Sequence, residues 1–253
     1  MQALVVLPTY NELANIDQVC RAILAAAPNV DILVVDDGSP DGTAHAAEQL
    51  GKELGHIEVL RRDRKQGLGQ AYLAGFARGL EQGYDALIEM DADLSHDPAT
   101  LPALIAKLDD ADLVIGSRYI PGGSIPQWSL RRRLLSQVGN RYSSLMLGVP
   151  LHDMTSGFRA YQADLLRRLT LDDTHANGYG FQIEMAYRAV QAGARVTEIP
   201  IRFVERKEGT SKMSLRITVE AIGLVTVMGF KRYGRALRSA RRRSASPAAA
   251  APR

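Results

Sequence analysis

Five short apolar runs, each followed by a segment with helical spacing, constrain the fold of this chain most strongly. The runs lack the apolar–polar alternation of a half-exposed strand, which is typical of strands buried on both faces. Strands of this kind occur in parallel sheets that are covered by helices on both sides. The sequence therefore predicts an α/β fold with a mainly parallel sheet sandwiched by helices. We expect strands at 3–8, 31–37, 57–62, 84–91 and 111–119, and helices at 13–28, 41–55, 67–83 and 97–110.

The second half of the chain is less regular but continues the same domain. Polar or Gly/Pro-containing loops are expected at 117–130 and 205–214, helices at 130–147, 181–193 and 215–237, a loop leading into a strand at 153–161, and a strand at 194–204. The last helix is amphipathic. We expect one globular domain over residues 1–237 and a disordered, basic, Ala/Pro-rich tail over 238–253.

The positive charge of the chain is concentrated at its C-terminal end. The formal net charge is +3, yet the stretch from Lys231 onward holds eight basic residues and no acid, so the rest of the chain is net acidic. An acidic body argues against nucleic acid as a partner, and a basic tail points to an anionic one. Cys20 is the single cysteine, and the first residues, MQALVVLPTYNE, lack the basic segment of a secretory signal. Both features favour the cytoplasm.

Polar side chains follow four of the predicted strands at their carboxyl ends. The clusters are Pro8–Glu12, Asp36–Ser39, Asp91–Asp93 and Ser117–Arg118. In open α/β sheets, ligands bind beyond this edge. Turns also favour Asp, Gly and Ser, so any one cluster could be only a turn. Four clusters at one edge, three of them acidic, favour a binding site.

Asp91 and Asp93 form a candidate metal site. In an extended segment, residues i and i+2 point the same way, and two carboxylates together suit Mg²⁺ or Mn²⁺. Such an ion would complete its shell with water and the phosphates of a nucleotide. The sequence has neither G-x-G-x-x-G after its first predicted strand nor G-x-x-x-x-G-K-[ST]. A dinucleotide-dependent oxidoreductase is therefore disfavoured, and the chain has no P-loop.

A series of motifs in order resembles the family 2 glycosyltransferases of GT-A (Rossmann-like) fold, and most closely the polyprenyl- or dolichyl-phosphate mannosyltransferases. The motifs are LPTYNE, VVDDGSPDGT, GLGQAYLAGF, MDADLSHDP, GSRY, WSLRRRLLS, TSGFRAY and RKEGTSK, between about residues 3 and 215. The resemblance implies inverting transfer of mannose from GDP-mannose to a polyprenyl phosphate, with Mg²⁺ or Mn²⁺ as cofactor. Related enzymes that move glucose or N-acetylglucosamine share many of these motifs.

The resemblance also implies roles for residues at the matching positions. Asp91 and Asp93 would bind the metal, and Ser95, a neutral hydroxyl, stands where some members have a glutamine ligand. The catalytic residues would be Asp93, Arg118 and Arg132, the last being the fourth residue after Trp128 and flanked by two further arginines. The substrate-binding set would be Pro8, Tyr10, Glu12, Val35 and Asp37 at the guanosine, and Asp91, Ala92, Asp93, Arg118, Arg132, Arg206 and Lys212 at the diphosphate, sugar and acceptor phosphate.

A lipid acceptor would require contact with a membrane surface. The most apolar segment, 217–230, contains Glu220 and is too short to span a bilayer. Followed by the basic tail, it fits peripheral binding to the cytoplasmic face or to a separate membrane subunit. The alternative is a C-terminal helix packed on the core with a solubilising tail.

Two other functions stay open at this point. The chain could use a different sugar nucleotide, such as UDP-glucose. It could instead be a non-catalytic subunit that binds a nucleotide sugar within a membrane complex. The basic residues singled out above could also be ordinary solvated side chains.

Overall fold

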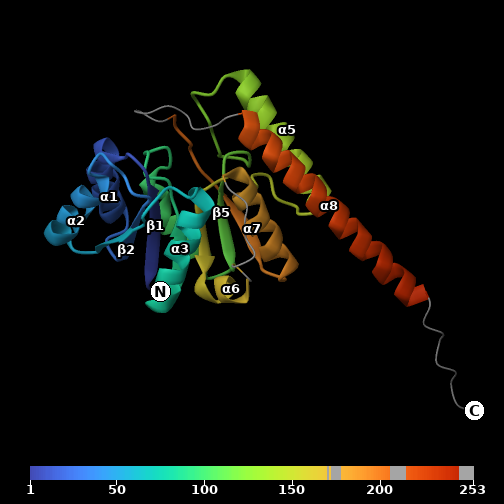
Figure 1. Cartoon of the computed structure of the whole chain (residues 1–253). Helices are drawn as coiled ribbons and strands as arrows, with labels where there is room; N and C mark the ends of the chain where they lie inside the picture. The colour runs from blue at the N-terminus through green and yellow to red at the C-terminus, as the bar shows by residue number, and fades with distance from the viewer. Residues whose placement is uncertain (170, 172–177, 206–214, 245–253) are drawn as a thin grey trace, which may run out of the picture.

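A seven-stranded sheet forms the centre of the molecule (Figure 1). The computed structural model describes residues 1–169, 171, 178–205 and 215–244. The strands are β1 (Ala3–Thr9), β2 (Val30–Asp36), β3 (Ile57–Arg61), β4 (Ala86–Glu89), β5 (Leu113–Ser117), β6 (Arg159–Gln162) and β7 (Val196–Pro200). The helices are α1 (Leu13–Ala26), α2 (Thr43–Leu54), α3 (Leu68–Glu81), the 3-10 turn η1 (Pro98–Thr100), α4 (Leu101–Lys107), α5 (Leu130–Leu147), α6 (Ala163–Arg168), α7 (Tyr179–Gln191) and α8 (Leu215–Ser244).

The sheet is parallel except for one strand. Its order is β3-β2-β1-β4-β6-β5-β7, and β6 runs antiparallel to both of its neighbours, β4 and β5. The prediction of a mainly parallel sheet is confirmed, and the first five strands lie where the apolar runs were. Because β1, β2, β4 and β5 all run in the same direction, the polar clusters that follow them lie at one edge of the sheet.

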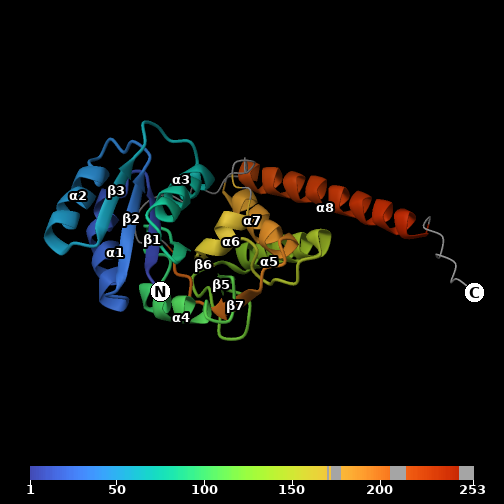
Figure 2. The same ribbon diagram turned by 90° about the horizontal axis from the view of Figure 1, so that it is seen from below.

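Helices cover both faces of the sheet, so the molecule has three layers (Figure 2). Apolar residues of α1, α2 and α4 pack on one face, and those of α3, α6 and α7 pack on the other. Helices α5 and α8 lie side by side at the outside of the second layer, and α8 extends beyond the body of the molecule. Among the described residues, we find no helix that is long and apolar enough to cross a bilayer.

Close approach of α3 to the sheet depends on glycine. A Cβ atom on Gly75 would lie 2.4 Å from Cγ1 of Val6, and one on Gly79 would lie 2.6 Å from Leu87. Contacts this short do not occur between real carbon atoms, so these positions exclude larger residues without a shift of the helix. The glycines therefore bring α3 close to β1 and β4.

Two predicted helices differ from the observed ones by more than two residues at one end. The helix expected at 97–110 is divided into η1 and α4, because Pro102 has no N–H to continue the hydrogen bonds of the first turn. Asp97 caps this segment as a helix N-cap does, and its carboxylate accepts from the N–H of Ala99 at 3.0 Å. The last helix continues past its predicted end at Leu237 to Ser244, since the segment RSARRRS holds good helix formers and neither glycine nor proline. Residues 238–244 are thus helical, whereas the sequence argument placed them after the end of the helix.

Candidate active site

Asp91 and Asp93 lie just beyond the carboxyl end of β4, as predicted, but in a turn and not in an extended segment. Ala92 and Asp93 form the turn, and Leu94 has a φ of +60°. The Asp93 carboxylate stabilises this geometry by accepting from the N–H of Ser95 at 3.0 Å. The turn leaves Asp91 partly exposed and Asp93 buried.

The side chains of this turn fit a divalent ion. Asp91 and Asp93 offer carboxylate oxygens, which Mg²⁺ and Mn²⁺ prefer. Ser95 is fully buried, and its Oγ has no hydrogen-bond partner within the described residues. A hydroxyl left in this state beside two carboxylates is suited to an added ligand.

Asp91 is held by residues from both sides of the site. The hydroxyl of Tyr72, on α3, donates to its Oδ1 at 3.3 Å. Burial, and then the negative charge of Asp91, raise the pKa of Tyr72 well above its usual value, so the hydroxyl stays a donor. The N–H of Asp91 donates to Nδ1 of His96, whose ring stacks on Phe158. The carboxylate therefore has a defined orientation.

The residues predicted to hold the guanosine lie at the ends of β1 and β2. The ammonium of Lys65 is 4.3 Å from the centre of the Tyr10 ring, a cation–π contact. Asp37 is buried and accepts from Nη1 of Arg62 at 2.7 Å. The N–H of Glu12 donates to Thr43, which joins the loop after β1 to the start of α2. A basic loop, containing Arg62 and Lys65, thus lies beside the candidate nucleotide site.

Arg118 lies at the end of β5 in a buried ion pair. Its Nε and Nη2 each donate to the carboxylate of Asp153 at 2.7 Å, and its N–H donates to the same group at 3.0 Å. Burial by itself would raise the pKa of Asp153, but the charge and hydrogen bonds of Arg118 outweigh it, and the pKa lies below its usual value. Nη2 of Arg118 also donates to Thr155. Arg118 is therefore held in one orientation.

Trp128 brings Arg118 and Arg132 together. The Arg132 guanidinium is 4.0 Å from the centre of a Trp128 ring, and that of Arg118 is 5.6 Å away. Arg132 follows the N-cap Ser129 in the first turn of α5 and donates to Glu205 at 2.7 Å. Trp128 thus lies between Arg118, which is buried and paired with Asp153, and Arg132, whose side chain is 30% exposed and can reach an anionic group from solvent.

The structure brings most of the predicted residues to one edge of the sheet. Pro8, the second-last residue of β1, is partly exposed, and Ala92 is buried in the turn. The side chain of Val35 lies in the core against α3. Arg206 and Lys212 lie outside the described residues. The sequence argument did not single out Tyr72, Arg62 or Asp153. The only signal for Asp153 was an acid two residues before the TSGFRAY motif.

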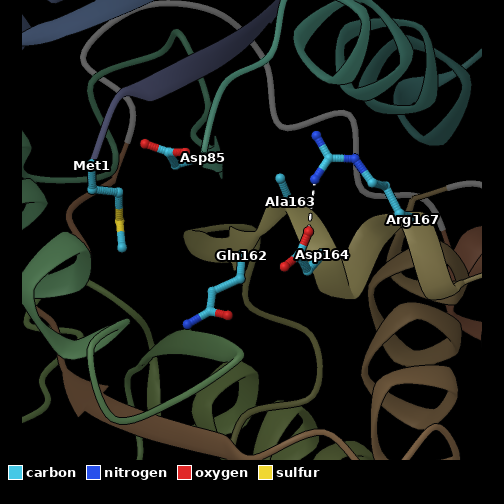
Figure 3. Close-up of a pocket in the computed structure, with 6 residues that line it drawn as sticks. All are labelled: Met1, Asp85, Gln162, Ala163, Asp164 and Arg167. Carbon is cyan, nitrogen blue, oxygen red and sulfur yellow. Dashed lines mark hydrogen bonds and ion pairs between the residues drawn. The ribbon is translucent and has the colours of Figure 1, made fainter.

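A separate hollow lies at the opposite edge of the sheet (Figure 3). It has a volume of about 290 Å³ and contains an ion pair between Asp164 and Arg167. Its lining residues precede β1 and β4, end β6 or belong to α6, and are Met1, Asp85, Gln162, Ala163, Asp164 and Arg167. This edge lacks the acidic turn and the paired arginines, so the hollow is not part of the candidate active site.

Comparison with known proteins decides the family. A model of the family described as "Glycosyl transferase family 2" matches residues 4–170, which is more than half of the chain. The chain belongs to glycosyltransferase family 2. It is 47% identical over 239 residues to the undecaprenyl-phosphate mannosyltransferase of Micrococcus luteus, covering 94% of this chain and 98% of that protein. It is also 47% identical to the polyprenol monophosphomannose synthase of Mycolicibacterium smegmatis, covering 91% and 88%.

Solved structures support the same fold. Glucosyl-3-phosphoglycerate synthase from Mycobacterium tuberculosis, solved with Mn²⁺, UDP-glucose and phosphoglyceric acid, superposes with a TM-score of 0.65. The match has 22% sequence identity and covers 90% of this chain and 79% of the other. The predicted GT-A fold is therefore confirmed. Membership of glycosyltransferase family 2 and the two relatives at 47% identity show that this chain is a glycosyltransferase.

Proposed function

We propose that this enzyme transfers mannose from GDP-mannose to a polyprenyl phosphate, with inversion at the sugar, to give polyprenyl phosphate mannose and GDP. The observation that carries this proposal is the 47% identity to a named mannosyltransferase over 94% of this chain. The acidic turn offers ligands for a metal ion, and the arginines on either side of Trp128 offer positive charge for a phosphate.

An acceptor phosphate needs positioning more than it needs a base. A phosphate monoester has a second pKa near 6, so it is mostly a dianion at pH 7 and is already nucleophilic. The difficulty is to bring this dianion close to an anionic donor. Arg118 and Arg132 would offset the repulsion and orient the phosphate. For this to happen, the acceptor phosphate must compete with Glu205 for Arg132 and with Asp153 for Arg118.

Asp91 and Asp93 would hold a divalent ion, Mg²⁺ or Mn²⁺, with Ser95 as a neutral third oxygen. The Mn²⁺ and UDP-glucose bound to the structurally similar synthase support this assignment. When bound, such an ion supplies Lewis-acid stabilisation of the leaving diphosphate. Tyr72 donates to the Asp91 carboxylate and His96 accepts from the main-chain N–H of Asp91, so both residues would hold this ligand in place.

The donor is tested by turnover with a panel of nucleotide sugars. Purified protein is incubated with Mn²⁺, a short polyprenyl phosphate and either GDP-mannose, UDP-glucose or UDP-N-acetylglucosamine. Release of GDP that depends on the lipid phosphate supports the proposal. Faster transfer from a UDP-sugar would assign a different donor, and no transfer from any of them would favour a non-catalytic subunit.

We also infer that the protein binds the surface of a membrane, peripherally and on its cytoplasmic face, because its acceptor is a lipid. Helix α8 has features of both alternatives considered for the last helix, which were packing on the core and contact with a membrane. Ala221 and Val225 pack on the body, whereas Val227 and Phe230 are exposed. On α5 a second apolar stripe is formed by Leu130, Leu134, Val138 and Leu145, which are 56–82% exposed. Around the axis of α5, with 100° per residue, these four side chains lie within an arc of about 80°. The buried residues Asn140, Ser143 and Leu147 lie on the opposite side of the helix.

The charge of α5 supports an anionic lipid surface as the partner of this apolar stripe. Helix α5 contains four arginines and no acid, and Arg132, at its start, belongs to the proposed acceptor site. Its exposed stripe would lie on lipid while Arg132 faces the lipid phosphate, and the basic end of α8 would add electrostatic attraction. An apolar stripe of this extent is unusual on a protein that contacts only water.

Liposome flotation tests this inference. Vesicles with anionic lipid should bind the wild-type protein, and Leu134→Asp with Val138→Asp should reduce binding at least about 10-fold, through loss of apolar burial. Leu13→Asp, which changes an exposed leucine on α1, is the matched control. Deletion of residues 231–253 measures the contribution of the basic end. Wild-type protein that reaches membranes only with another membrane protein present would point to a separate membrane subunit.

A further inference from the structure

Arg159 is a fully buried arginine to which the proposed reaction gives no role. It begins β6 and lies opposite Glu89 of β4 in the antiparallel register, and both residues are 0% exposed. A charge in the core is costly unless a counter-charge and hydrogen bonds compensate it. Glu89 faces Arg159 from β4, and burial raises the pKa of the Glu89 carboxyl to about 7, whereas the charge of Arg159 favours its ionised form. The hydrogen bonds of the guanidinium show which segments of the chain it holds together.

The guanidinium of Arg159 binds main-chain carbonyl groups from two segments. Nη2 donates to Met154 and Nε donates to Ser156, both at 2.8 Å. Nη1 donates to Gln182, in the first half of α7, at 2.7 Å. The planar fork of arginine matches acceptors that surround it in different directions. Arg159 thus ties residues 153–158, the loop before β6, to α7.

This loop contacts both halves of the candidate active site. At its start, Asp153 and Thr155 hold Arg118 through hydrogen bonds of 2.7–3.0 Å. Toward its end, Gly157 lies beside the metal site, where a Cβ atom would be 4.0 Å from both carboxylate oxygens of Asp91. The position of the loop therefore sets where Arg118 lies relative to Asp91.

We propose that Arg159 is a positioning residue that fixes the loop 153–158 and thereby holds Arg118 in register with Asp91. The inference rests on the proposed function, in which Arg118 meets the acceptor phosphate and Asp91 the metal and diphosphate. Lysine at this position would keep the charge opposite Glu89. Its single nitrogen lacks the fork that reaches carbonyl groups of Met154, Ser156 and Gln182 at once.

The test compares Arg159→Lys with wild type and with Gln162→Ala. Gln162 lies on the same strand, and its amide donates to the carbonyl groups of Leu108 and Ala111, so its loss removes a similar tie away from the site. Turnover per folded molecule is measured with the donor and acceptor that the wild type uses best. Arg159→Lys should lower kcat about 10- to 100-fold and raise KM for the acceptor, with affinity for GDP and Mn²⁺ within about 2-fold. Gln162→Ala should stay within about 2-fold of wild type in kcat.

A double variant separates positioning from a general structural role. If Arg159 acts through Arg118, Arg118→Lys combined with Arg159→Lys should be no slower than Arg118→Lys alone, within about 3-fold. Multiplied losses, or an Arg159→Lys enzyme with wild-type kcat per folded molecule, would overturn the inference. Should Arg159→Lys fail to fold, Glu89→Gln with Arg159→Met removes both buried charges and is compared with Glu89→Gln under the same expectations. A wild type that is inactive with every nucleotide sugar would instead refute the proposed function, and this inference with it.

Discussion

Replacing Asp153 with asparagine isolates the buried ion pair that holds Arg118. Asp153 accepts three hydrogen bonds from Arg118, and the two side chains are 0% and 4% exposed. Asparagine keeps one acceptor oxygen but turns an NH₂ group toward donors and leaves the guanidinium charge uncompensated. Breaking a buried pair from one side costs about 3–5 kcal/mol. At about 2–4 °C per kcal/mol for a chain of this size, the melting temperature should fall by about 6–20 °C.

The assay is thermal unfolding of Asp153→Asn beside Asp112→Asn. Asp112 also pairs with an arginine, but Arg195 is 62% exposed there, so its loss should cost no more than about 1 kcal/mol. The pKa of Asp153 is lower in the folded state, so its ionised form stabilises the fold above the unfolded pKa of about 3.9. This contribution is lost as the pH falls through the folded pKa.

The pH dependence of the loss in melting temperature tests whether the charge of Asp153 stabilises the fold. The difference in melting temperature between wild type and Asp153→Asn should be constant from about pH 5 to pH 8 and shrink below about pH 4. Equal effects of Asp153→Asn and Asp112→Asn would show that the buried pair adds nothing over an exposed one. A difference that grows as the pH falls would show that the ionised form of Asp153 does not stabilise the folded state.

Three further outcomes test other parts of the molecule. Asp93→Asn should reduce transfer at least about 100-fold in a Mn²⁺-dependent assay, and unchanged turnover would contradict its role at the metal. Arg132→Ala should raise KM for polyprenyl phosphate about 10-fold while GDP-mannose binding, measured by calorimetry, stays the same; equal loss of both would contradict its assignment to the acceptor. Gly75→Ala should cost about 1–3 kcal/mol in denaturant unfolding, because its Cβ meets Val6 at 2.4 Å, whereas Gly139→Ala on α5 meets nothing within 4 Å and should cost no stability.

Local patterns predicted most of the secondary structure. The strands β1, β2 and β4 were found because their residues are apolar on both faces, which follows from the chain alone. Helix α5 begins and ends as predicted, since Ser129 caps one end and Gly148 adopts a left-handed conformation at the other. The end of α8 was missed because composition suggested disorder where alanine and arginine continue the helix.

The amino-acid sequence by itself determined that an acidic motif would follow a buried strand at the carboxyl edge of a parallel sheet. It also determined which family the motifs resemble, since both depend on residues close together in the chain. Only the tertiary structure decided that β6 inserts antiparallel between β4 and β5, and that Asp153 meets Arg118 across 35 positions of sequence. Strand order and buried charge pairing depend on which distant segments pack together, and no local pattern specifies that choice.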